Sequence, residues 1–159
     1  MTEEPMSHAT IYTDGSCKKN PGGPGAWAAL IVADGTKIQL SGGFRNTTSN
    51  RMEMRAAIEA LKSLHGSWKV DLYTDSTYLK DGITSWVYRW QRNGWRTYTG
   101  KPVKNEDLWR ELLKHIGRHQ MTWHWVKGHA KNEHNNLVDE LAGRVASNVG
   151  RRDPEDTIT

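Results

Sequence analysis

Alternating apolar and polar positions predict three strands in the first part of the chain. Residues 10–14 alternate and stop abruptly at Asp14, before a Gly/Pro-rich loop. Residues 26–33 form an unbroken apolar run, which is typical of a strand covered on both faces. Asp34-Gly35 then favours a hairpin turn with a returning strand over residues 36–45. The pattern predicts an antiparallel meander of three strands.

From Ser49 the apolar residues recur at helical spacing, which predicts a helix with its capping residues at the start. The strand over 69–75 follows this helix, and such a crossover leaves it parallel to the first strand. The remaining elements are a short helix capped by Ser76, an amphipathic helix over 105–119, a strand over 121–126 and a final helix capped by Asn135 or Asn136. The sequence therefore predicts an α/β fold with a five-stranded mixed sheet flanked by helices.

The length of 159 residues indicates one domain, which we place at residues 8–149 with flexible termini at 1–7 and 150–159. Cys17 is the only cysteine, so an intramolecular disulfide is excluded and a reducing compartment is favoured. No apolar run approaches ~20 residues, and the first residues lack the apolar core of a signal peptide. We expect a cytoplasmic monomer that does not enter a membrane.

Four carboxylates stand where predicted strands end or predicted helices begin. Tyr-Thr-Asp occurs twice and ends on Asp14 and on Asp75, while Glu53 and Asp139 lie in first helical turns. Taken singly, a first-turn acid is more often a cap or a complement to the helix dipole. Taken together, the four positions gather at the edge of the sheet where ligands bind in this fold class. Oxygen ligands of this kind fit Mg²⁺ or Mn²⁺, and two such ions can support phosphodiester cleavage.

The segment 85–105 combines aromatic residues with five cations and contains no acid. Aromatic rings and cations together suit stacking and phosphate contact. The alternative is that Trp86 and Trp90, four residues apart, anchor a helix in the core while the cations are solvated. We interpret the segment as a mixture of buried tryptophans and a basic rim. With the carboxylates, it predicts a metal-dependent nuclease.

Three histidines have ordinary explanations when each is taken alone. His115 and His119 are four residues apart and could clasp a metal, but without a third ligand they are predicted to be surface histidines. His129 lies in a polar loop, where a histidine is more often solvated than catalytic.

Five motifs in order resemble the bacterial type 1 ribonuclease H family. They read Y-T-D-G-S-C-K-K-N-P-G, N-R-M-E-M-R-A-A-I-E-A-L, Y-T-D-S-T-Y, W-V-K-G-H-A and D-E-L-A, and the match runs from about residue 9 to 148. The tryptophan-rich basic segment is similar to the substrate-binding protrusion of that family. The resemblance implies hydrolysis of the RNA strand of RNA–DNA hybrids by two Mg²⁺ ions, which Mn²⁺ can replace, to give 3′-hydroxyl and 5′-phosphate ends.

The resemblance also assigns roles to individual residues. It makes metal ligands of Asp14, Glu53, Asp75 and Asp139, and makes His129 a mobile histidine that assists proton transfer or product release. The residues implied to hold a phosphate of the DNA strand are Asn20, Thr48 and Arg51. Those implied to follow the RNA minor groove are Cys17, Ser49, Asn50 and Thr77. Contacts from the basic segment are expected from Trp86, Arg89, Trp90, Arg92, Trp95 and Arg96.

Two residues depart from the family pattern, and one has no assigned role. Ser49 stands where relatives often carry Asn, and Thr77 where they often carry Gln, so base-edge contacts there are in doubt. His134 has no role in the pattern. Two rival functions stay open: an integrase-like enzyme of the same fold, for which the chain lacks a separate DNA-binding domain, and a non-catalytic module that binds hybrid or double-stranded RNA.

Overall fold

The computed structural model describes residues 6–126 and 133–156, and its centre is a five-stranded mixed sheet in the order β3-β2-β1-β4-β5. The strands are β1 (His8–Cys17), β2 (Gly25–Ala33), β3 (Thr36–Phe44), β4 (Lys69–Thr74) and β5 (Gln120–Trp125). The first three pair antiparallel, and β4 lies parallel to both β1 and β5. The predicted α/β fold with a meander and parallel strands is confirmed.

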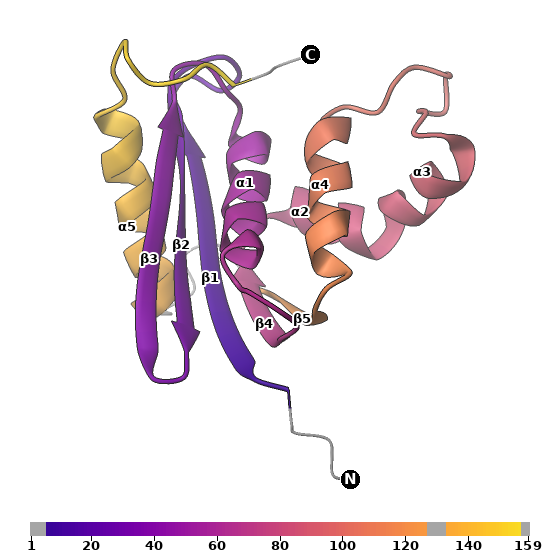
Figure 1. Ribbon diagram of the computed structural model, residues 1–159. Helices are drawn as coiled ribbons and strands as arrows, with labels where there is room; N and C mark the ends of the chain where they lie inside the picture. The colour runs from indigo at the N-terminus through magenta and orange to yellow at the C-terminus, as the bar shows by residue number, and fades with distance from the viewer. Residues whose placement is uncertain (1–5, 127–132, 157–159) are drawn as a thin grey trace, which may run out of the picture.

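Helices cover both faces of the sheet (Figure 1). They are α1 (Ser49–Lys62), α2 (Thr77–Asp81), α3 (Val87–Asn93), α4 (Glu106–Ile116) and α5 (Glu133–Ser147), with a π-helical stretch, η1 (Gly82–Trp86), between α2 and α3. In Figure 1, α1 and α4 lie on one side of the sheet, α5 lies on the other, and α3 stands out beyond α4. Among the described helices, none combines the length and the apolar content that a membrane crossing needs.

The first strand is longer than the sequence predicted. β1 continues past Asp14 to Cys17, because Gly15, Ser16 and Cys17 pair with the first residues of β2. Its parallel pairing with β4 ends earlier, at Tyr12 opposite Tyr73. Asp14 therefore lies just beyond the point where β4 stops accompanying β1. A strand that is paired on one side only leaves an open notch there.

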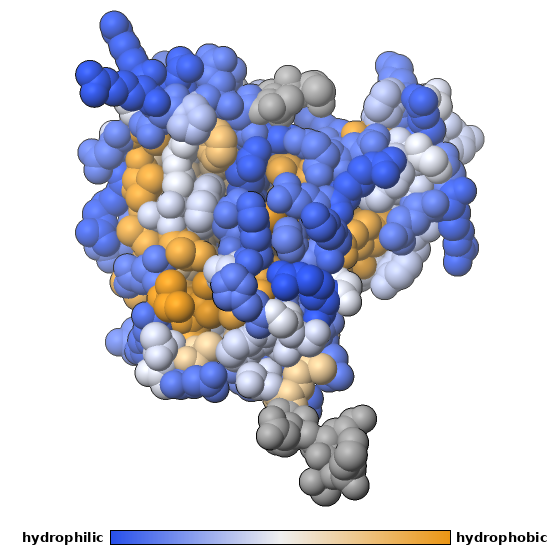
Figure 2. Space-filling model, in the orientation of Figure 1, coloured by the Kyte–Doolittle hydropathy of each residue, from blue (hydrophilic) through white to orange (hydrophobic). Residues whose placement is uncertain are grey.

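Two apolar clusters hold the layers together. The larger one lies between the sheet and the helices α1 and α4, and the smaller one fixes α5 to the opposite face through Ala28, Leu30, Val138 and Ala142, all of them buried. On the face seen in Figure 2, hydrophilic residues dominate and the apolar colour is strongest over the lower part of the β2–β3 hairpin. Burial of these clusters supplies most of the driving force for folding.

Residues 150–156 fold back onto the domain, so the predicted flexible tail is wrong for this stretch. Asp156 has a fully buried side chain and accepts hydrogen bonds from Arg51, Arg55 and Thr47. The backbone of Arg45 also bonds Pro154. The prediction failed because the tail has few apolar residues, and nothing local in its sequence marks Asp156 as the buried partner of Arg51 and Arg55.

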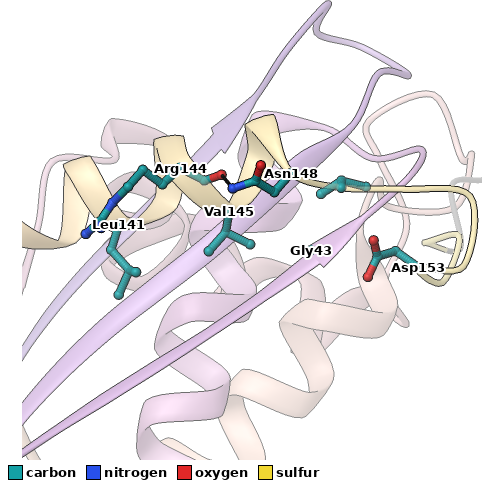
Figure 3. A pocket seen from close by; sticks show the side chains of 7 residues that line it. Gly43, Leu141, Arg144, Val145, Asn148 and Asp153 are labelled. Atoms are coloured by element: carbon teal, nitrogen blue, oxygen red, sulfur yellow. Dashed lines mark hydrogen bonds between the residues drawn. The ribbon is translucent and has the colours of Figure 1, made fainter.

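The tail begins at the end of α5, which lies next to the end of β3 (Figure 3). Figure 3 shows Leu141, Arg144 and Val145 along the last turns of α5 and Asn148 just after its end, with Gly43 of β3 opposite and Asp153 on the returning tail. These side chains border a hollow of about 300 Å³. A methyl group on Gly43 would come within 2.7 Å of Val149, so the glycine allows this close approach.

The prediction of surface histidines at His115 and His119 is wrong. His115 is 8% exposed, and His119 accepts a hydrogen bond at Nδ1 from the backbone N–H of Trp68. Burial lowers the pKa of both imidazoles, with nearby Arg118 adding to the effect. They are packing residues at the C-terminal end of α1, whose last carbonyls accept hydrogen bonds from Arg118.

Candidate metal centre and nucleic-acid interface

Three carboxylates from three elements meet at the notch between β1 and β4. Asp14 comes from β1, Glu53 from the first turns of α1, and Asp75 from the residue after β4. One oxygen from each lies within 4.8 Å of the other two. Asp14 is 5% exposed and Glu53 is 9% exposed, whereas Asp75 faces solvent. The cluster is thus closed at its base and open on one side.

Gly15 makes the approach of Glu53 possible. A methyl group on Gly15 would stand 2.4 Å from the backbone nitrogen of Glu53 and 2.5 Å from the carbonyl carbon of Met52. No side chain fits there, so α1 rests directly on β1 beside Asp14. The glycine next to the first aspartate therefore sets the distance between the first two acids.

The metal-free cluster holds negative charge poorly. Burial raises the pKa of Asp14 to about 8, with a hydrogen bond to Asp139 and repulsion from Asp75 adding to the effect. Burial and the charges of Asp14 and Asp75 raise the pKa of Glu53 well above its usual range. Asp14 Oδ2 and Glu53 Oε2 are buried and have no hydrogen-bond partner among the described residues. A bound cation would supply the partner that these two buried carboxylate oxygens need.

Asp139 is the fourth predicted ligand and comes from the second turn of α5. Its side chain is exposed and reaches Asp14, to which it is hydrogen bonded. It lies outside the group of three acids that share mutual contact within 4.8 Å. The structure therefore brings Asp139 to the rim of the cluster. His129 lies outside the described residues.

The first residues of α1 and α2 include three of those predicted to follow the RNA minor groove. Ser49, Asn50 and Thr77 border a pocket of about 280 Å³ together with Glu53 and Asp75. This places the three polar side chains next to the acid cluster.

The loop before this pocket is tied to α1 by hydrogen bonds. Thr48 caps α1 by accepting a hydrogen bond from the backbone of Arg51, and Asn20 accepts one from the backbone of Ser49. Cys17 is half-buried, and its thiol lies 3.4 Å from the carbonyl oxygen of Thr47. The predicted phosphate-binding positions Asn20 and Thr48 therefore shape the start of the helix, and of these two only Asn20 is exposed.

Arg51 does not face the site, so its predicted phosphate contact is wrong. The side chain is 1% exposed and forms salt bridges of 2.8 Å with both Asp107 and Asp156. Its Nη1 also donates to Asn105. A guanidinium with this many fixed partners ties α1, α4 and the tail together. No local sequence pattern reveals this arrangement, because the partners lie more than 50 residues away.

The basic segment forms an aromatic groove next to α2. Trp86, Arg89, Trp90 and Tyr98 border a cavity of about 340 Å³, to which Lys104 also contributes. Trp86 and Trp90 are half-buried, and the arginines Arg89, Arg92 and Arg96 are exposed. The predicted mixture of buried tryptophans and a basic rim is confirmed.

Trp95 belongs to the buried part of this mixture. It is 7% exposed, its ring lies tilted 6.0 Å from that of Trp90, and the guanidinium of Arg110 covers it at 4.8 Å. Its predicted contact with substrate stays a prediction, and only a small part of the ring is available for it. The left-handed backbone of Trp95, with φ at 64°, turns the ring inward after Gly94 ends α3.

Two side chains beside the acid cluster were not predicted. Trp125, at the end of β5, donates from Nε1 to the carbonyl oxygen of Asp75 at 3.3 Å and is 43% exposed. Lys80 lies over its ring at 4.8 Å. The signal available was a tryptophan at the last strand position, which periodicity alone does not distinguish from a core residue.

Comparison with known proteins places the chain in one family. The family model described as RNase H matches residues 6–147. A protein named Ribonuclease H from Nitrobacter hamburgensis is 50% identical over 142 residues, covering 89% of this chain and 93% of the relative. Another, from Agrobacterium fabrum, is 50% identical over 147 residues, covering 92% of this chain and all of the relative.

A solved structure supports the same assignment. LC9-RNase H1, described as a type 1 RNase H with the type 2 active-site motif, is 30% identical with a TM-score of 0.80, over 92% of this chain and 75% of that one. Sequence and fold thus agree over nearly all of the chain. The chain belongs to the ribonuclease H family.

Proposed function

We propose that this protein is an endoribonuclease that hydrolyses the RNA strand of RNA–DNA hybrids with the help of two divalent cations, Mg²⁺ in the first place, and leaves 3′-hydroxyl and 5′-phosphate ends. The observation that carries the proposal is the notch at which Asp14, Glu53 and Asp75 converge within 4.8 Å, where two buried carboxylate oxygens lack partners in the part of the chain that the structure describes. Family membership and the names of the relatives support the substrate class.

The residues present fit a hard cation. Every side chain in the cluster offers oxygen, and the described chain brings neither sulfur nor imidazole into it, which suits Mg²⁺ or Mn²⁺ better than zinc. Asp14, Glu53 and Asp75 would hold the ions, with Asp139 closing the open side. When bound, the cations supply activation of the attacking water and neutralisation of charge on the leaving oxygen.

The chain's own groups do the rest. Ser49, Asn50 and Thr77 stand beside the acids and can contact the sugar edge of the RNA strand, where the 2′-hydroxyl distinguishes RNA from DNA. The exposed arginines of the basic segment and the groove at Trp86 suit the second strand, because phosphate contacts and stacking need no particular sequence. His129 is proposed to assist proton transfer or product release.

Two rival functions fit the structure less well. An integrase-like enzyme would share the acids but leaves the aromatic groove without a use. A non-catalytic binding module gains nothing from three converging acids, since burial, with repulsion from Asp75 and Asp139 adding to it, raises the pKa of Asp14 to about 8 in the absence of a cation. A single-domain monomer in the cytoplasm remains part of our proposal.

A cleavage assay on strand-labelled duplexes tests the proposal. The wild-type protein is incubated with an RNA–DNA hybrid labelled on either strand, with double-stranded RNA and with double-stranded DNA, in Mg²⁺ or in EDTA. We expect cutting of the RNA strand of the hybrid alone, in Mg²⁺ alone. Binding without cutting would favour the binding module, and cutting of the DNA strand would favour the integrase-like enzyme.

A further inference from the structure

A row of four stacked rings crosses the sheet on the face that α5 covers. The ring of His134 lies 4.6 Å from that of Tyr12, Tyr12 lies 5.0 Å from Tyr73, and Tyr73 lies 4.4 Å from His124. The interplanar angles are 23°, 18° and 11° in the same order, so the rings are close to parallel. Stacked rings of this kind stabilise one another beyond the effect of their burial.

The row follows from the repeated Tyr-Thr-Asp. Tyr12 is in register with Tyr73, and Tyr73 with His124, so the three strand residues lie side by side. Residues two apart in a strand point to the same face, so Tyr12 shares its face with Asp14. The ring of Tyr12, on which His134 stacks, therefore lies on the same strand face as Asp14, the first acid of the cluster.

His134 is the member of the row that comes from α5. It precedes Val138 by one helical turn, so both point from α5 toward the sheet. Val138 packs with Ala28, Leu30 and Ala142, and these contacts fix α5 to the sheet from its second turn onward. A planar ring seated on Tyr12 supplies a second fixed point and so sets the rotation of the helix about its axis.

The rotation of α5 decides where Asp139 stands. Asp139 follows Val138 directly, and its exposed side chain reaches Asp14. A turn of the helix by 20° would move a carboxylate about 6 Å from the axis by roughly 2 Å, enough to lose a hydrogen bond. The first turns of α5 therefore need a contact that holds their angle.

We propose that His134 is a positioning residue of the metal centre, which stacks on Tyr12 and thereby holds Asp139 against Asp14. This inference rests on the proposed function, since it takes the acid cluster to be a cation site. It assigns to His134 a role that depends on its flat ring.

Cation binding to two substitutions of His134 tests the inference without substrate. Binding of Mn²⁺ to the whole protein is measured by isothermal titration calorimetry for wild type, His134→Ala and His134→Phe. We expect His134→Ala to weaken binding by about 5- to 20-fold, as supporting contacts of metal ligands commonly do, and His134→Phe to stay within about twofold of wild type. Thermal unfolding in EDTA shows whether each variant is folded.

A matched control uses the far end of the row. His124→Ala removes a ring that stacks on Tyr73 and leaves α5 untouched, so its Mn²⁺ affinity should equal that of wild type. Wild-type affinity in His134→Ala would overturn the inference, as would an equal loss in His134→Phe or in His124→Ala. A wild-type protein that binds Mn²⁺ but leaves hybrids intact would refute the proposed function and not this inference.

Discussion

Replacing Asp14 by asparagine should make the metal-free protein more stable while ending its nuclease activity. Asp14 is 5% exposed, one of its carboxylate oxygens has no hydrogen-bond partner within residues 6–126 and 133–156, and two further acids lie within 4.8 Å. An amide of the same shape removes the charge, and its N–H₂ group can donate to Glu53 or Asp139. The substitution therefore relieves repulsion in the folded state and deletes a ligand at the same time.

The expected size follows from the pKa of Asp14, which is raised from 3.8 to about 8 in the folded protein. A tenfold change in proton affinity corresponds to about 1.4 kcal/mol, so the upper limit is roughly 6 kcal/mol. Because Asp75 is solvated and the amide is itself costly to bury, we expect a gain of about 2 kcal/mol at pH 8.5. For a domain of this size this corresponds to a rise in Tm of about 4–8 °C.

The pH dependence gives the gain a signature. Below pH 3.8 both the folded and the unfolded wild-type protein keep the Asp14 proton, and no penalty exists. As the pH rises toward about 8, the unfolded chain releases the proton and the folded protein retains it, so wild-type stability falls. The stability difference between Asp14→Asn and wild type should grow over this interval and level off above about pH 8.

Urea unfolding in EDTA at pH 5, 7 and 8.5 measures this difference. Glu140→Gln is the matched control, since Glu140 is an exposed acid outside the cluster. It should change the free energy of unfolding by less than about 0.5 kcal/mol at every pH. In Mg²⁺ the difference in the free energy of unfolding between Asp14→Asn and wild type should become smaller, because bound cation stabilises only the wild-type protein. An Asp14→Asn protein that is no more stable than wild type at pH 8.5 would refute the reasoning.

Three further predictions concern residues around the site. Asp156→Asn should lower the free energy of unfolding by about 3 kcal/mol, because Arg51 is left buried with one charged partner missing. Glu155→Gln, at an exposed position, should leave the free energy of unfolding unchanged. Equal urea midpoints for the two variants would contradict this prediction. Replacing three exposed arginines by glutamine should reduce the slope of log K against log salt for hybrid binding by about 2, and an unchanged slope would remove them from the interface. Those three are Arg89, Arg92 and Arg96. His129→Ala should slow turnover without ending it, and a normal rate in single-turnover kinetics would make His129 a spectator.

The sequence was sufficient for the fold because its elements are local. Apolar periodicity located α1 and α4, the Asp34-Gly35 turn located the β2–β3 hairpin, and the crossover rule made β4 parallel to β1. The errors arose where distant parts of the chain meet. The buried carboxylate of Asp156 and the extension of β1 to Cys17 depend on partners that no local pattern reveals.

Part of the candidate site was also predictable from local sequence patterns. Asp14 and Asp75 follow from strand ends, but a first-turn glutamate such as Glu53 has a common explanation as a cap, and only the family resemblance overrode it. Arg51 was misplaced because a cation next to the site in sequence points inward in space. The ring of His134 gave no signal, since its stacking partner Tyr12 lies more than 100 residues earlier.

Anomalous diffraction from a crystal soaked in Mn²⁺ tests most directly whether the three converging acids form a cation site. We predict a strong anomalous peak at the notch between β1 and β4, within about 2.5 Å of carboxylate oxygens of Asp14 and Asp75, and no such peak in an Asp14→Asn crystal. Mn²⁺ bound only elsewhere, with the three acids still in contact with one another, would contradict the account.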